Sequence, residues 1–348
     1  MVMTKKETVF VGVSGGVDSS VSLAILQEQG FNVVGCFIKT WQPDFIECTW
    51  KEERRDAMRV CASLDVPFLT IDAEKEYKDA VGMYMINEYK AGRTPNPDVM
   101  CNKEVKFGVF LKKALELGAD FVATGHYART DNKKLFKGLD ESKDQSYFLW
   151  TLTKEQLSKI KFPIGNLQKN KVREIAKKYN LFTAEKKDSQ GVCFLGPIDM
   201  KDFLKHYIEV TNGDVLNKNG EVVGSHDGAL LYTLGERHGF TITQKGTDDG
   251  RMYIVSRDLS KNTITVSSEI NDSDQEQKNK IKISDINWIT TPEYGKKYSA
   301  RIRYQQTLEN CLIEGDFVIF DNPQNTATAG QSVVVYDGEE CVGGGIIA

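Results

Sequence analysis

The sequence contains no long hydrophobic run. Nowhere do about 18 consecutive apolar residues occur without a charge, so no membrane-spanning helix is predicted. The early apolar run at residues 9–13 follows Lys5 and Lys6 but is shorter than the roughly 7 to 15 residues of a signal-peptide core. We therefore expect no membrane partner and a soluble, cytoplasmic protein.

Closely spaced cysteines are also absent. The chain has seven cysteines and no Cys-x-x-Cys pair. Secreted disulfide scaffolds, zinc sites and iron–sulfur sites usually need such short spacings. We therefore expect reduced thiols, and neither zinc nor an iron–sulfur cluster.

Excess positive charge is lacking as well, since the formal net charge is −4. This balance argues against a protein that coats nucleic acid through bulk electrostatics, but it permits a local basic face. Residues 161–187 hold eight Lys or Arg against two Glu, and 8 − 2 gives +6. This segment is either such a face or an ordinary solvated helix surface.

The first two hundred residues alternate short β-branched runs with longer helical patterns. This alternation predicts an α/β fold, a doubly wound parallel sheet with crossover helices. The expected strands are residues 8–13, 32–38, 67–71 and 120–124. The expected helices are residues 18–29, 51–64, 73–90 and 102–117.

The texture of the sequence changes near residue 208. Asn219-Gly220 between two apolar pairs predicts a hairpin. Residues 271–280 are typical of a linker, and residues 300–304, 316–320 and 332–336 are expected strands of a small β-barrel or sandwich. We thus expect a catalytic domain at residues 1–207, a small β-containing module at 208–275 and a C-terminal barrel at 276–348.

A glycine-rich loop follows the first expected strand. Ser14-Gly15-Gly16-Val17-Asp18-Ser19 leads directly into the first expected helix. Such a turn offers backbone N–H groups and a positive helix end to phosphate. The loop lacks the lysine of the Gly-x-x-x-x-Gly-Lys motif and differs from the dinucleotide fingerprint. Its alternative interpretation is a Ser/Gly turn with an Asp cap.

Two cysteines lie in distinctive local contexts. Cys101 closes Pro95-Asn96-Pro97-Asp98-Val99-Met100-Cys101, at the expected start of a helix, where a thiol pKa is lowered. Asp98 is available there for proton transfer. Cys193 closes Asp188-Ser189-Gln190-Gly191-Val192-Cys193, just after the basic segment. Taken alone, either cysteine is more often a small buried hydrophobe.

The loop resembles that of the ATP pyrophosphatase (PP-loop) superfamily, and this resemblance implies an adenine nucleotide α-hydrolase-like fold for the parallel-sheet domain. Together with the two cysteine segments, the chain closely resembles the tRNA-specific 2-thiouridylase family, called MnmA or TrmU, from about residue 8 to the C-terminus. The resemblance implies that ATP adenylates O2 of a tRNA wobble uridine, and that persulfide sulfur then replaces the activated oxygen. It also implies ATP and Mg²⁺ as cofactors and tRNA as the partner.

The resemblance assigns roles to individual residues. Cys193 is expected to carry the persulfide, and Cys101 to form a transient disulfide with it. Asp98 is expected as the acid/base, and Asp18 as a Mg²⁺ ligand. Expected ATP-binding residues are Gly12, Val13, Ser14, Gly15, Gly16, Val17, Asp18, Ser19, Ile38 and Gly125. Expected contacts with the target base or tRNA are Asn96, Pro97, Asp98, His126, Lys143, Asp144, Gln145, Arg303, Tyr304 and Gln331.

Several of these contacts also have structural interpretations. His126 is equally expected as a hydrogen-bonding structural residue. The residues Lys143-Asp144-Gln145 are expected to be exposed. Arg301 and Arg303 alternate as in a strand, which would place both on one face with Gln305, although an ordinary barrel face is the other interpretation.

Other PP-loop enzymes remain alternatives. An adenylating synthetase that forms an amide or a guanidine would share the loop but needs no cysteine pair. A non-catalytic tRNA-binding or nucleotide-sensing module would need neither feature. The sequence identifies neither the tRNAs, the oligomeric state, nor the sulfur donor, for which we expect a cysteine desulfurase or a sulfur-relay protein. It also leaves open whether sulfur leaves as hydrosulfide or by direct persulfide attack.

Overall fold

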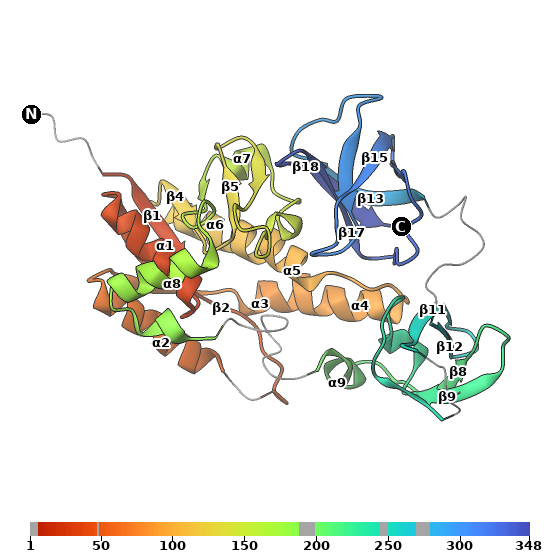
Figure 1. Cartoon of the computed structure of the whole chain (residues 1–348). Helices are drawn as coiled ribbons and strands as arrows, with labels where there is room; N and C mark the ends of the chain where they lie inside the picture. The colour runs from red at the N-terminus through yellow and green to blue at the C-terminus, as the bar shows by residue number, and fades with distance from the viewer. Residues whose placement is uncertain (1–5, 47–48, 188–198, 244–249, 269–278) are drawn as a thin grey trace, which may run out of the picture.

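The computed structural model of the chain describes residues 6–46, 49–187, 199–243, 250–268 and 279–348. These residues form three sheets, namely a parallel sheet flanked by helices, a small central sheet and a barrel near the C-terminus (Figure 1). None of the described helices has both the length and the apolar character needed to cross a membrane.

The parallel sheet has the strand order β3-β2-β1-β4-β7. Its strands are β1 Thr8–Gly12, β2 Asn32–Lys39, β3 Phe68–Asp72, β4 Phe121–Ala123 and β7 Ile160–Lys161. The expected strands are confirmed within about two residues at each end. Because β2 and β4 flank β1 on opposite sides, the chain reverses its direction of progress across the sheet at β1, where α/β proteins place ligand sites.

The first two expected helices are confirmed as α1 Val17–Glu28 and α2 Trp50–Ser63. The next two are interrupted by π-helical turns, which the sequence does not reveal. The segments are α3 Glu74–Tyr77, η1 Lys78–Met83, α4 Tyr84–Lys90, α5 Pro97–Met100, η2 Cys101–Phe110 and α6 Leu111–Glu116. π turns inside helices often occur at functional sites, and η2 begins at Cys101.

Short elements connect the parallel sheet to the rest of the chain. They are β5 Ala128–Thr130, β6 Leu135–Lys137, η3 Ser146–Phe148, α7 Lys154–Leu157, α8 Lys169–Lys178, η4 Phe182–Glu185 and α9 Met200–Lys205. Helix α8 packs on α1, where Val17 and Val21 share a buried cluster with Val172 and Ala176 (Figure 1).

The central sheet has the strand order β10-β9-β8-β12-β11. Its elements are β8 Gly213–Leu216, β9 Val222–His226, η5 Ala229–Leu231, β10 Phe240–Ile242, β11 Tyr253–Asp258 and β12 Thr263–Ser267. The predicted hairpin is confirmed, because β8 and β9 are antiparallel and joined through a turn where Gly220 has φ 83°.

The C-terminal barrel closes through β13, which pairs with both β16 and β18. Its strands are β13 Lys280–Trp288, β14 Tyr298–Arg301, β15 Glu309–Glu314, β16 Phe317–Phe320, β17 Ser332–Asp337 and β18 Glu340–Ile347. The expected strand at 300–304 is wrong beyond Arg301, where the chain bends. Lys280 of the expected linker belongs to β13, and residues 271–278 lie outside the described residues.

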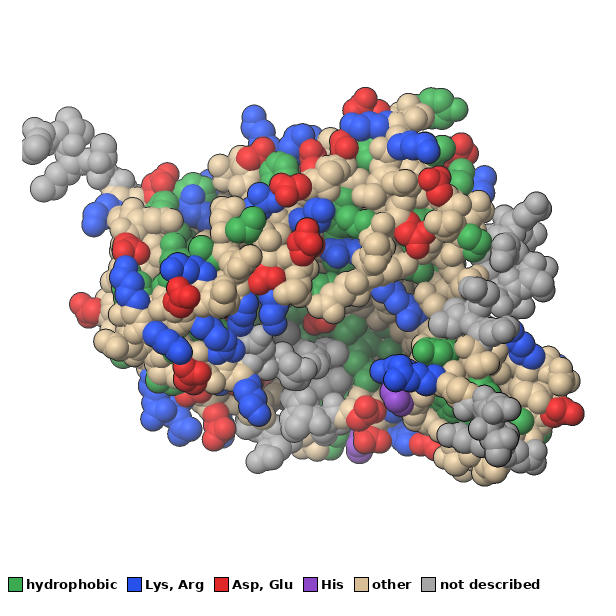
Figure 2. All heavy atoms as spheres, in the orientation of Figure 1, with side chains coloured by type: hydrophobic (Ala, Val, Ile, Leu, Met, Phe, Trp, Pro, Cys, Tyr) green, Lys and Arg blue, Asp and Glu red, His purple; other side chains and the backbone are tan. Residues whose placement is uncertain are grey.

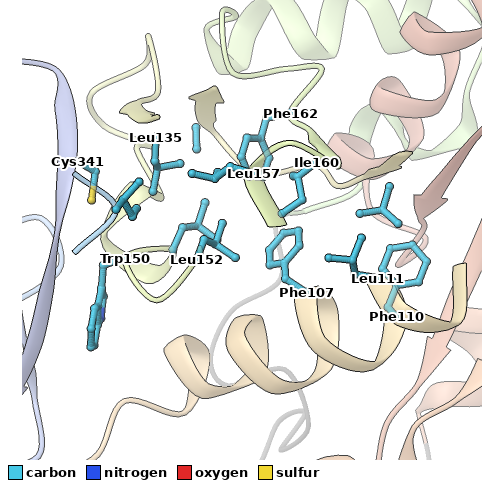
Figure 3. Close-up of a cluster of buried hydrophobic side chains, with 14 of the residues drawn as sticks. Phe107, Phe110, Leu111, Leu135, Trp150, Leu152, Leu157, Ile160, Phe162 and Cys341 are labelled. Carbon is cyan, nitrogen blue, oxygen red and sulfur yellow. The ribbon is translucent and has the colours of Figure 1, made fainter. Parts of the chain in front are cut away.

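The barrel is tied to the parallel-sheet domain by a shared sheet and a shared core. Hairpin β5–β6 extends β18, with Leu135 opposite Cys341. Figure 3 shows Trp150, Leu135 and Cys341 at one end of a buried cluster whose other end holds Leu111 and Phe110. This common core holds the barrel against the segments that carry the candidate site.

Candidate active site

A cavity of about 270 Å³ lies at the carboxyl edge of the parallel sheet. It brings together residues from β1, α1, β2, η2 and the segment after β4. Ten residues predicted from the sequence line it: Gly12, Val13, Ser14, Asp18, Ser19, Ile38, Cys101, Gly125, His126 and Gln145. Val17 instead packs its side chain into the α1–α8 cluster.

The glycine-rich loop is shaped to leave backbone groups exposed to a ligand. Gly16 caps α1 without a side-chain hydrogen bond, so the first-turn N–H groups of α1 have no side-chain cap. Ser19 Oγ instead accepts from the Ser14 amide (3.2 Å). A Cβ on Gly15, which has φ 76°, would lie 2.9 Å from Asp56 Cβ, and a Cβ on Gly125 would lie 2.7 Å from the Ser19 nitrogen. Larger residues at both glycines would therefore distort this loop.

Two side chains hold the Asp18 carboxylate, one from the segment after β4 and one from the start of α8. Tyr127 Oη donates to Asp18 Oδ1 (2.8 Å), and Lys169 Nζ donates to both carboxylate oxygens (2.8 and 2.9 Å). Among the described residues, no group of three or more His, Cys, Asp or Glu side chains is placed to hold a metal ion.

Cys101 lies one turn into a helix that begins at Pro97. The Asn96 side chain caps this helix by accepting from the amides of Asp98 (3.2 Å) and Val99 (3.3 Å). The predicted position of Cys101 near a helix N-terminus is confirmed, and the residue is only 4% exposed while its side chain lines the cavity. Cys193 lies outside the described residues.

The other described cysteines are buried within the fold, as expected for packing residues. Burial raises the pKa of Cys36 to about 12, that of Cys61 to about 11 and that of Cys311 to about 12. Cys341 is also buried, and burial raises its pKa. These thiols remain protonated at neutral pH and are therefore unreactive.

Asp98 and His126 both have perturbed proton affinities. Burial raises the pKa of the Asp98 carboxyl, and the positive charge of Lys106 opposes this effect. Burial lowers the pKa of His126 well below its ordinary value, and Lys106 lowers it further. His126 is thus neutral, with Nδ1 2.8 Å from Thr124 Oγ1. Asp98 is not among the residues that line the cavity.

The expected exposure of Lys143-Asp144-Gln145 is wrong for Asp144, which is 4% exposed. Its Oδ2 forms a 2.7 Å ion pair with Arg301 Nη2 of the barrel, and burial of both groups requires such pairing. Gln145 lines the cavity, and its Oε1 accepts from the Tyr127 amide (3.0 Å). Lys143 is partly exposed.

Tyr304 and Gln331 contact the first domain, whereas Arg303 contacts the central module and the barrel. The prediction that Arg301 and Arg303 share one face of a strand is wrong, because β14 ends at Arg301. Arg303 instead donates hydrogen bonds to the carbonyls of Leu234 (2.5 Å) and Thr326 (3.1 Å). The centroids of the Tyr304 and Phe148 rings lie 4.5 Å apart.

The barrel also contacts the approach to the Cys101 helix. Gln331 Nε2 donates to Thr94 O (2.9 Å) and Pro95 O (3.4 Å), two residues that precede Asn96 and Pro97 in the chain. Thr94 N in turn donates to Ala329 O (2.8 Å). The turn before β17 thus holds the start of the segment that carries Cys101.

Three lysines near the cavity belong to none of the motifs that the sequence shows. Lys106 lines the cavity beside Cys101, whereas Lys169 reaches Asp18 and Lys186 Nζ donates to Gly15 O (3.1 Å). The last two belong to the basic segment at residues 161–187, whose charge was the only available signal. The sequence allows that segment to be a basic face or a solvated surface, and two of its lysines contact the glycine-rich loop.

Comparisons with known proteins cover nearly the whole chain. Models described as "tRNA methyl transferase HUP domain", "tRNA methyl transferase PRC-barrel domain" and "Aminomethyltransferase beta-barrel domain" match residues 7–197, 201–268 and 278–347. The tRNA-specific 2-thiouridylase MnmA 2 of Geobacillus kaustophilus is 46% identical over 353 residues, which are 97% of this chain and 94% of that protein.

Two further relatives show a comparable similarity. The tRNA-specific 2-thiouridylase MnmA of Bacillus subtilis is 47% identical over 97% of this chain and 94% of its own. The protein of that name from Francisella philomiragia is 44% identical over 97% of this chain and 98% of its own. The similarity therefore extends across all three sheets.

Proposed function

This chain belongs to the tRNA-specific 2-thiouridylase family, and we propose that it is an ATP-dependent tRNA-uridine 2-sulfurtransferase that acts on the wobble uridine. One observation carries the proposal. A single cavity is lined both by the glycine-rich loop and by Cys101. Phosphate-binding backbone and a sulfur nucleophile are the two features that adenylation followed by sulfur transfer requires together.

ATP makes the displacement of the uracil oxygen chemically feasible. The uridine O2 attacks the α-phosphorus, pyrophosphate departs with the electron pair of the broken P–O bond, and the N3 proton is lost. The resulting O-adenylate expels AMP easily, whereas the free carbonyl oxygen is a poor leaving group. The ATP-binding residues in this proposal are Gly12, Val13, Ser14, Gly15, Gly16, Val17, Asp18, Ser19, Ile38 and Gly125.

Asp18 and Ser19 fit a role beside Mg²⁺. A carboxylate and a hydroxyl at the start of α1 are oxygen ligands of the kind that Mg²⁺ prefers, and this ion usually adds water and substrate phosphates to one or two carboxylates. When bound with ATP, Mg²⁺ would neutralise phosphate charge. The residues themselves orient the loop through the Ser14–Ser19 hydrogen bond.

Sulfur transfer requires two cysteines in the proposed scheme. A persulfide on Cys193 attacks C2 of the adenylated uridine with its terminal sulfur, and AMP leaves. The Cys101 thiolate then attacks the inner sulfur, so that a Cys101–Cys193 disulfide forms and the S–S electron pair stays with the thiouridine. Alternatively, Cys101 attack first releases hydrosulfide, which displaces AMP. A cysteine desulfurase or a sulfur-relay protein supplies the persulfide.

Asp98 is the proposed acid/base, and burial raises its pKa, which favours the protonated form that a general acid needs. Proposed contacts with tRNA or the target base are Asn96, Pro97, Asp98, His126, Lys143, Asp144, Gln145, Arg303, Tyr304 and Gln331. Because Asp144 is buried, we propose that it supports RNA binding indirectly, by holding the neighbouring residues in place. Lys and Arg side chains on the rim of the hollow between the barrel and the central sheet support an RNA-binding face (Figure 2).

The three parts of the chain divide this work. We assign catalysis to residues 1–207, the central module to 208–275 and tRNA binding by a barrel to 276–348. The contacts of Gln331 with Thr94 and Pro95 support a barrel that also positions the catalytic segment.

The test is an assay for 2-thiouridine. The purified protein is incubated with ATP, Mg²⁺, unmodified tRNA and a cysteine desulfurase with cysteine, and the digested RNA is examined by mass spectrometry. Cys101→Ser and Cys193→Ser should abolish 2-thiouridine, whereas Cys311→Ala, a buried barrel cysteine, should retain it. Release of AMP and pyrophosphate without 2-thiouridine would show that the acceptor is wrong.

A further inference from the structure

The glycine-rich loop contains no lysine, yet two lysines from a distant segment reach it. Lys169 Nζ lies 2.8 and 2.9 Å from the two Asp18 carboxylate oxygens. Lys186 Nζ donates to Gly15 O (3.1 Å) and to Asp56 Oδ2 (2.8 Å). Both lysines come from the segment that contains α8, which lies across α1 (Figure 1).

Lys169 is held in place more firmly than a surface lysine. It is the first residue of α8, its amide donates to Asp140 Oδ2 (3.0 Å), and its side chain is only 14% exposed. The ammonium group lies 5.8 Å from the centre of the Tyr127 ring, and Tyr127 is itself 2% exposed and donates to Asp18. Surface ion pairs seldom have this many fixed partners.

The proposed reaction creates a need for positive charge at this point. Cleavage between the α- and β-phosphates leaves pyrophosphate, which carries the bonding electron pair and several negative charges. Backbone N–H groups contribute only partial charges, and the phosphate-binding loops of enzymes that transfer the γ-phosphate contain a lysine. Lys106, the cation among the described residues that line the cavity, lies on η2 beside Cys101 rather than at the start of α1.

We propose that Lys169 binds the β- and γ-phosphates of ATP and stabilises the pyrophosphate leaving group, and that Asp18 holds it at the loop until nucleotide arrives. The proposal rests on the ATP-dependent function above. Lys169 thus supplies, from a helix 151 positions further along the chain, the charge that the loop lacks. On nucleotide binding, the Lys169 ammonium group would exchange the Asp18 carboxylate for a phosphate. The free energy needed to remove this group from water is therefore already spent in the nucleotide-free protein.

Comparison of ATP with AMP binding tests the assignment, because AMP lacks the β- and γ-phosphates. Equilibrium binding is measured with Mg²⁺ and without tRNA for the wild type, Lys169→Met, Lys169→Arg and Lys171→Met. Loss of a charge-assisted contact should weaken ATP and pyrophosphate binding by about 10- to 100-fold in Lys169→Met, with AMP binding unchanged. Lys169→Arg should recover part of the affinity. Lys171, which pairs with Glu174 on the exposed side of the same helix, is the matched control.

Two results would overturn the assignment. An equal loss of ATP and AMP affinity would mean that Lys169 only orders the loop through Asp18, and unchanged ATP affinity would exclude phosphate contact. If Lys169→Met does not fold, Lys169→Gln keeps the comparison available, with the melting temperature as the check. Because these measurements need neither RNA nor sulfur, their outcome is independent of the 2-thiouridine assay.

Discussion

The ion pair between Asp144 and Arg301 should contribute strongly to the attachment of the barrel. The Arg301 Nη2–Asp144 Oδ2 distance is 2.7 Å, and the side chains are 8% and 4% exposed. The same nitrogen donates to Tyr336 Oη (2.8 Å), so Arg301→Met would leave a buried carboxylate without its cation. We therefore expect Arg301→Met to destabilise the folded protein.

The size of the loss follows from the partners that remain. Removal of one member of a buried pair typically costs about 3–5 kcal/mol. Asp144 would still accept from the Gly138 amide and from the Ser146 amide and hydroxyl, each at 3.0 Å, so we expect the lower end, about 3 kcal/mol. For a domain of about 150–250 residues, this loss of stability corresponds to a fall in Tm of roughly 6–12 °C.

Thermal unfolding of a double-mutant cycle measures the pair. Asp144→Asn added to Arg301→Met removes the unpaired charge, so the double variant should be at least as stable as Arg301→Met alone. Lys282→Met, which removes an exposed 3.6 Å pair with Asp316 on the barrel, should leave Tm almost unchanged. A fall of less than about 2 °C for Arg301→Met, or additive losses in the double variant, would refute this reasoning.

Three further perturbations have defined outcomes. Burial raises the Asp98 pKa, so the folded state holds this proton to higher pH and loses stability as pH rises from the unfolded pKa through the folded one. Asp98→Asn should therefore raise the Tm at pH 7, and the difference in Tm from the wild type should shrink toward pH 4. The rate of thiolation should fall in the same variant. Gly125→Ala places Cβ 2.7 Å from the Ser19 nitrogen, and an overpacking cost of about 1–3 kcal/mol should weaken ATP binding about tenfold or more in a titration. Gly330→Ala, at φ 92° and 2.9 Å from the Thr94 backbone, should lower Tm by several degrees and slow thiolation in a kinetic assay.

Local patterns in the sequence predicted most of the secondary structure of the first domain. Alternating apolar runs and helical periodicity depend on neighbouring residues, so β1, β2, α1 and α2 fall close to their expected bounds. The π-helical turns at Lys78 and Cys101 were missed because no residue pattern distinguishes them from an α-helix. The strand expected at 300–304 is wrong beyond Arg301, because β14 ends there and the chain bends, although its residues continue the alternating pattern.

The sequence by itself determined the glycine-rich loop between the first strand and helix, the placement of Cys101 at the start of a helix and the family of the chain, since each depends on short runs of residues. Only the tertiary structure decided which distant groups meet these motifs. It buried Asp144 against the barrel, joined β6 to β18 and brought Lys169 to Asp18. The physical reason is that pairing between charges or strand edges depends on distance in space, and the path of the chain sets that distance only after the cores have packed.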